Sequence, residues 1–181
     1  LGLLGLTACE STSNFMDSIG LDGFGDRRSE EFLLESLCPQ TEVVGELAAF
    51  SAFNPPEASE EEHLQARAHI AEIESACEFG DRSVTVEMEL DFAAALGPEG
   101  RRLQSYEFPY FIAVTTKSGE ILTKEVFSAS IDFPTKVSQV SHKEGLRQII
   151  PLDNPKKAKD LKILTGFQLS QAQLDYNRNI I

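Results

Sequence analysis

Two stretches of the chain alternate apolar and polar residues with a period of two. In residues 84–92 every second residue is apolar, and the residues between them are polar or acidic. Residues 126–133 repeat this pattern, with Phe127, Ala129, Ile131 and Phe133 on one face. A β-strand with one buried face and one solvated face has this periodicity, because its side chains point alternately to the two faces. The alternation therefore predicts sheets that each bury one face in a common core.

Further segments extend this pattern into a mainly β chain. The run from Tyr110 to Val114 is apolar at nearly every position and predicts a central strand. Residues 162–169 predict another strand, in which Gly166 marks a bulge or a close approach. Turn residues separate these runs, and no long helix lies between them. We therefore expect a single antiparallel, immunoglobulin-like β-sandwich of about seven strands over residues 37–181.

The segment from Glu60 to Phe79 fits two structures. As a helix it would gather Leu64, Ala68 and Ala71 on one face. As a strand it needs a bulge near Ala71, because its apolar alternation changes phase there. We prefer the strand, because it allows a hairpin with residues 41–50 that is consistent with the cysteine positions.

The same hairpin would bring two of the three cysteines together. If residues 41–50 and 66–77 pair around the loop 54–62, Cys38 and Cys77 lie almost opposite each other, with the bulge absorbing a one-residue offset. Facing residues in an antiparallel pair are close enough for a disulfide. We therefore predict a Cys38–Cys77 bond. The alternative is a pair of buried free thiols, and a helix over residues 60–78 would separate the two cysteines.

The C-terminal segment carries the start signal of a helix. Ser170 and Gln173 have the spacing of a capping box, and Leu169 and Leu174 that of a hydrophobic staple around it. We expect a short helix that covers one end of the sandwich.

The N-terminal residues indicate where in the cell the protein is located. Residues 1–8 are almost entirely apolar or glycine, and the tetrad Leu6-Thr7-Ala8-Cys9 resembles the bacterial lipobox. The resemblance implies that residues 1–8 are the end of a removed signal peptide, that Cys9 is lipidated, and that residues 9–36 form a flexible tether. Glu10, in place of the aspartate that favours the inner membrane, implies the outer membrane, facing the periplasm. The alternative is a buried N-terminal strand with an ordinary cysteine.

Charge limits the partners of the chain. It has 16 basic and 29 acidic residues, a formal net charge of −13, which opposes binding to nucleic acid. One basic stretch stands out as a candidate site for an envelope partner or for an anionic group such as a lipopolysaccharide phosphate: Lys156, Lys157, Lys159 and Lys162. The alternative is a solvated loop that these lysines keep soluble.

No motif in the sequence specifies a reaction. The three histidines lack zinc-ligand spacing, no serine lies in a nucleophile elbow, and the glycines at 20, 23 and 25 lack dinucleotide-loop spacing. We therefore predict no catalytic residue, no metal and no cofactor. The expected function is that of a non-enzymatic structural or interaction module, which would meet a partner at its sheet edges or at the lysines. The alternative is a periplasmic hydrolase that uses carboxylates in a pocket not recognisable from sequence.

Three segments together resemble a known group of proteins. The runs "PYFIAV", "ILTKEVFSASIDF" and "GFQLSQAQLDYNR" are similar to segments of short alphaproteobacterial outer-membrane lipoproteins, over roughly residues 38–178. Small departures include Ile112 for valine and Ser170 for threonine. That group has no assigned activity. The resemblance therefore implies a location and a fold, and it adds no catalytic residue.

Overall fold

The computed structural model describes residues 36–102 and 104–180, which contain eight strands, three short 3₁₀ helices and one C-terminal α-helix. The strands are β1 (Gln40–Val43), β2 (Ala49–Phe53), β3 (Leu64–Phe79), β4 (Ser83–Leu96), β5 (Ser105–Thr116), β6 (Ile121–Asp132), β7 (Gln139–Pro151) and β8 (Leu161–Phe167). The helices are η1 (Gly45–Leu47), η2 (Glu61–His63), η3 (Pro155–Asp160) and α2 (Gln171–Ile180).

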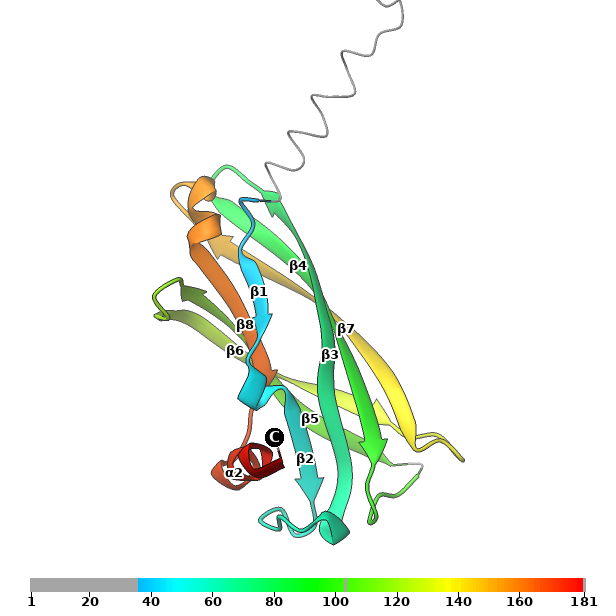
Figure 1. Cartoon of the computed structure of the whole chain (residues 1–181). Coiled ribbons are helices and arrows are strands. Elements are labelled where there is room, and N and C mark those ends of the chain that lie inside the picture. The colour runs from blue at the N-terminus through cyan, green and yellow to red at the C-terminus, as the bar shows by residue number, and fades with distance from the viewer. Residues whose placement is uncertain (1–35, 103, 181) are drawn as a thin grey trace, which may run out of the picture. The chain divides into compact units, whose positions relative to one another are not determined.

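The strands form two four-stranded sheets packed around one core (Figure 1). One sheet has the order β1-β8-β5-β6 and the other the order β2-β3-β4-β7. The prediction of a mainly β, two-sheet fold with a short C-terminal helix is confirmed. The described residues contain eight strands, one more than the approximate number expected. One detail was wrong: β1 pairs with β8 in parallel, while the other neighbours pair antiparallel.

The extra strand arises because the predicted strand over residues 41–50 is broken in the middle. The 3₁₀ helix η1 interrupts it, so that β1 joins one sheet and β2 the other. The segment that crosses from one sheet to the other, η1, passes over β8 at Gly166. A Cβ atom at Gly166 would lie 2.7 Å from the Cβ of Leu47. A larger residue would block the crossing, which explains the glycine and confirms the predicted close approach.

The segment 64–79 is one long strand, so the helical alternative for it is wrong. In the pairing of β3 with β4, Ile70 lies opposite Phe92 and Glu72 lies opposite Asp91, which leaves Ala71 as the extra residue of a bulge. The bulge lies where the apolar alternation changes phase. The sequence pattern thus located it correctly.

Aromatic side chains fill the space between the sheets. Phe92, on β4, lies 5.2 Å from Tyr110 and 5.9 Å from Phe167 between ring centroids, and the latter two belong to the opposite sheet. Phe50, on β2, packs edge-on against Phe167 at 5.8 Å. Such tilted and edge-to-face pairs are the favoured geometry of aromatic rings. The alternating residues of β4 and β6 point into this core, as predicted.

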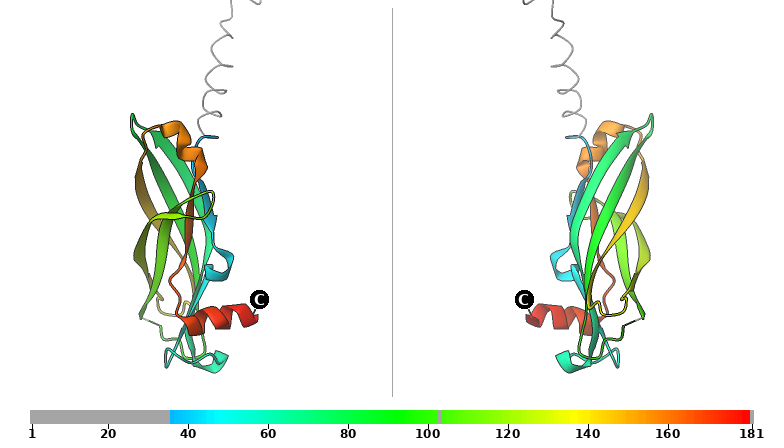
Figure 2. Two further views of the ribbon diagram at one scale, coloured as in Figure 1. Left: turned by 90° about the vertical axis from the view of Figure 1, so that its left-hand side faces the viewer. Right: turned by 90° about the vertical axis from the view of Figure 1, so that its right-hand side faces the viewer.

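The helix α2 begins with the predicted capping box. The Gln173 amide N–H donates to Ser170 Oγ at 3.3 Å, and the Ser170 N–H donates to Gln173 Oε1 at 2.9 Å. The helix contacts η1 and β2, so it lies against the side of the sandwich and does not cover an end as predicted (Figure 2). The helix η3 lies at the end of the sandwich where β1 begins (Figures 1 and 2).

Candidate interaction surface

The four edge strands are the first places to look for a binding surface. They are β1 and β6 in one sheet and β2 and β7 in the other. An edge strand presents unpaired backbone N–H and C=O groups, which can pair with another chain unless something protects them. Three of the four edge strands have features that hinder pairing with another chain.

The edge strand β1 lies along the C-terminal part of β3 and is linked to it (Figure 1). Cys38, just before β1, forms a disulfide with Cys77 of β3, with 5.8 Å between their Cα atoms. Thr41 Oγ1 and Ser75 Oγ share a hydrogen bond at 3.1 Å. The predicted disulfide is present, but the predicted reason for it was wrong. The two cysteines meet across the seam between the two sheets and not within one hairpin, since β2 pairs with β3 whereas β1 pairs with β8.

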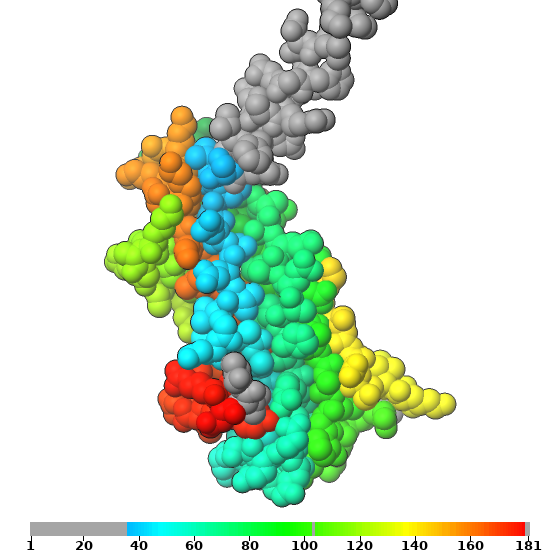
Figure 3. Space-filling model, in the orientation of Figure 1, coloured from blue at the N-terminus to red at the C-terminus, as the bar shows by residue number. Residues whose placement is uncertain are grey.

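The edge of β2 is covered by the C-terminal helix. Gln173 Nε2 donates to the carbonyl of Ser51 at 3.0 Å, and Asn177 Nδ2 donates to the carbonyl of Ala49 at 2.8 Å. These carbonyls are edge groups that an incoming strand would use. Figure 3 shows α2 in red against the cyan segment that carries η1 and β2. The side-chain amides of α2 thus occupy the hydrogen-bonding positions that a neighbouring strand would use.

A second contact fixes the same helix through Tyr176. Arg67 Nη2 donates to the Tyr176 hydroxyl at 2.6 Å, and that hydroxyl donates to Glu61 Oε2 at 2.8 Å. The hydrogen bond from Tyr176 lowers the pKa of the Glu61 carboxyl. Phe53 packs edge-on against the Tyr176 ring at 5.0 Å between centroids. Arg67, Glu61 and Tyr176 therefore hold α2 in place.

The edge of β7 carries polar residues that point inward. His142 and Glu144 lie opposite the core residues Phe92 and Leu90 of β4. The Tyr110 hydroxyl donates to Glu144 Oε2, and His142 Nε2 lies 3.1 Å from Glu144 Oε1. Burial and the bond to Glu144 raise the pKa of the Tyr110 phenol, so it stays protonated and acts as a donor. Inward-facing charge is a common protection of edge strands.

The edge of β6 has the most exposed apolar surface. Four large hydrophobic residues are exposed in the described part of the chain, and three of them lie on β6: Ile121 at 61%, Leu122 at 52% and Val126 at 56%. The fourth is Ile149 of β7, also at 56%. In the described residues no strand pairs with β6 on the side away from β5. Exposed apolar residues that gather in one place mark interaction sites.

An apolar groove lies beside this edge, on the outer face of the same sheet. Its volume is about 220 Å³, and the residues that line it include Leu47, Phe111, Ala113, Ile121, Leu164 and Leu174. Lys124 crosses its rim, with Nζ 4.3 Å from the centroid of the Phe111 ring and 2.9 Å from Gln168 Oε1. The groove and the β6 edge together form what we call the β6 surface.

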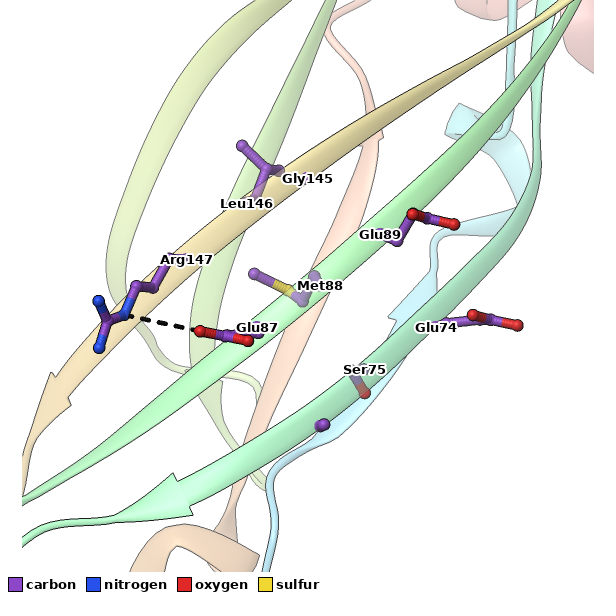
Figure 4. Close-up of a pocket in the computed structure, with 9 residues that line it drawn as sticks. Glu74, Ser75, Glu87, Met88, Glu89, Gly145, Leu146 and Arg147 are labelled. Atoms are coloured by element: carbon purple, nitrogen blue, oxygen red, sulfur yellow. Dashed lines mark ion pairs between the residues drawn. The ribbon is translucent and has the colours of Figure 1, made fainter.

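Carboxylates gather elsewhere, on the outer face of the other sheet. A hollow of about 550 Å³ lies over β3, β4 and β7 at Gly145, and Glu74, Glu87 and Glu89 line it (Figure 4). Arg147 lies 4.0 Å from Glu87, and Lys143 bonds Glu89. These groups lie on an open sheet face and neutralise each other in part. Among the described residues no group of three or more histidine, cysteine or acidic side chains could hold a metal ion.

The four lysines singled out in the sequence do not form one patch. Lys156, Lys157 and Lys159 are exposed on η3, where Ala158 is buried and Asn154 caps the helix by accepting from the Lys156 N–H. Lys162 belongs to β8 and pairs with Glu42 of β1 at 3.1 Å. The structure therefore leaves three lysines on one short helix and uses the fourth within the sheet.

Sequence reasoning did not single out the β6 surface. The predicted strand began at Val126, whereas β6 begins at Ile121. The available signal was the pair Ile121 and Leu122, two large apolar residues next to each other at the start of a strand. Cys9, the predicted lipidation site, lies outside the described residues. No described helix is both long and apolar enough to cross a membrane. No family model and no curated protein matches the chain.

Proposed function

We propose that this chain is a non-enzymatic interaction module of the bacterial cell envelope. In this proposal a lipid on Cys9 anchors it to the outer membrane, and its folded part faces the periplasm. The lipobox-like tetrad that ends at Cys9 supports the anchor. The disulfide supports an oxidising compartment, since such bonds form and persist there.

The observation that carries the interaction role is the β6 surface. Three exposed hydrophobic side chains lie on one edge strand, beside an apolar groove, while the other edges are fastened, covered or polar. Leaving such an edge open invites pairing with another chain. The unprotected edge of β6 therefore supports a role in binding a partner.

We also assign the sandwich to the immunoglobulin-like group. Two four-stranded sheets around one core support this assignment. Sandwiches of this group share an architecture without sharing one order of connections. Here β3 and β4 form a hairpin within one sheet.

The exposed lysines of η3 offer a second contact, to an anionic partner such as the phosphates of lipopolysaccharide. They lie at the end of the sandwich where β1 begins (Figure 1). Lys117 already pairs with Asp160 at the end of this helix, at 3.5 Å. Any such contact would be electrostatic and would weaken as salt is added.

The proposal can be tested in cells that express the natural gene. A photo-crosslinking residue at Thr123, on β6, should give one discrete protein adduct in the membrane fraction. The matched control at Ser141, which is also exposed and lies on the β7 edge, should give none. Cys9→Ser should abolish labelling by a fatty-acid probe and release the protein from the membrane.

Two results would contradict the proposal. Equal adducts from Thr123 and Ser141, or none from either, would remove the interaction role of β6. Fatty-acid labelling that persists in the Cys9→Ser variant would show that Cys9 is not the anchor.

A further inference from the structure

We propose that β6 binds an extended segment of a partner protein by strand addition, and that this segment alternates apolar with basic residues. The proposal deepens the interaction role above and rests on it. It names the kind of partner that the β6 surface accepts and the register of its side chains.

The backbone of β6 determines that the occupant is a strand. In the described residues β6 pairs only with β5, so the backbone groups on its other side have no strand partner. Main-chain hydrogen bonds supply affinity in such complexes, and side chains at alternate positions supply specificity. Residues 121–128 are long enough to offer about four positions on each face.

The outer face of β6 selects apolar residues. In the register with β5, Val126 lies opposite Phe111 and Lys124 lies opposite Ala113. Val126 is 56% exposed, while Phe111 and Ala113 are buried beside the groove. An added strand would place its outer side chains next to Val126 and Ile121, where apolar residues remove the most apolar surface from water.

The inner face of β6 selects basic residues. Glu125 lies opposite the core residue Ile112, so it belongs to the inner row, yet it is exposed. Glu125 forms no ion pair within the described part of the chain. A lysine or arginine opposite it would gain a cross-strand pair, because opposite charges that face each other across two strands attract.

Charge also decides between a foreign strand and a second copy of this chain. Each copy carries a formal charge of −13, so two copies repel each other as they approach. A basic strand is attracted by the same charge. The observed charge distribution therefore favours a partner of opposite sign over self-association.

The test measures binding of a short labelled peptide to the full chain by fluorescence anisotropy. The probe is the peptide VKVKVKV, with VDVDVDV as the charge-reversed control and VVVVKKK as the control of equal composition. We expect VKVKVKV to bind at least tenfold more tightly than either control. Added salt should reduce this difference.

Two variants test the site, and a third is the matched control. Val126→Ser should weaken binding of VKVKVKV by about tenfold, because it removes most of a buried valine contact. Ile149→Ser removes an equally exposed side chain from the β7 edge and should change binding less than twofold. Glu125→Lys should reverse the preference, so that VDVDVDV binds more tightly than VKVKVKV. Circular dichroism checks that each variant is folded.

Several outcomes would overturn the inference. These are no preference for VKVKVKV, equal effects of Val126→Ser and Ile149→Ser, or an unchanged preference in Glu125→Lys. A concentration-dependent dimer that only Val126→Ser abolishes would identify a second copy as the occupant. If the peptides fail while crosslinking from Thr123 in cells succeeds, the interaction role stands and the strand chemistry is wrong. The opposite pair of results would leave the surface intact and remove its role in the cell.

Discussion

Removal of the Cys38–Cys77 bond should lower the free energy of unfolding by about 4 kcal/mol. The two cysteines are 39 residues apart in sequence. For a loop of this length, the chain-entropy model gives about 4 kcal/mol at 25 °C through the restriction of the unfolded chain. For a domain of this size, such a loss corresponds to a fall in Tm of roughly 10 °C.

The structure indicates where the loss would appear first. β1 has four residues and a strand partner on one side only, β8. Besides the disulfide, Thr41 bonds Ser75 across the seam. Without the covalent link, β1 depends on these few bonds, and its amides should exchange with solvent faster than those of β3.

The assay compares urea unfolding of the wild-type chain and of the variant with both Cys38→Ser and Cys77→Ser. Far-UV circular dichroism is a suitable probe because the chain has no tryptophan. The slope of free energy against urea should rise slightly, because an unlinked unfolded chain exposes more surface. Both chains carry Cys9→Ser, so that neither a lipid nor a third thiol affects the comparison. A difference below about 1 kcal/mol would refute the reasoning, and so would alkylation of both cysteines in unreduced native protein.

Two further predictions concern buried polar contacts. Tyr110→Phe should lower the free energy of unfolding by about 1.5 kcal/mol at pH 7, since Glu144 loses a donor. The raised pKa of Tyr110 means that its contribution is complete below about pH 10 and declines at higher pH, so unfolding curves of the two proteins should converge there; a constant difference would contradict this. Asn177→Ala should cost about 1–3 kcal/mol and speed hydrogen exchange in α2, because Asn177 is 3% exposed and bonds the β2 edge. The exposed Asn179→Ala is its control, and equal losses in the two variants would refute the edge-covering role.

Local sequence patterns predicted the strands and the helix start well. The alternation in β4 and the phase change at Ala71 depend on residues that are neighbours in the chain, and a strand places such neighbours on opposite faces by its own geometry. The capping box at Ser170 and Gln173 is local in the same sense. Such features do not depend on how the rest of the chain folds.

The disulfide shows the limit of this kind of reasoning. The pair was correct, but the hairpin that suggested it extends only over β2 and part of β3. The bond is made because η1 moves β1 into the opposite sheet, where it lies beside β8. No pattern within residues 38–50 indicates that crossing, because it depends on Gly166, far along the chain, to leave room for Leu47.

The sequence by itself determined which face of each strand is buried, where β3 bulges, how α2 begins and how acidic the chain is. Only the tertiary structure decided which strands are edges and which edges remain open. Edge status depends on pairing between distant residues: Glu42 and Lys162, 120 residues apart, meet because β1 pairs with β8. The open edge of β6 follows from the same long-range pairing, since β5 is the only strand that pairs with β6 in the described part of the chain.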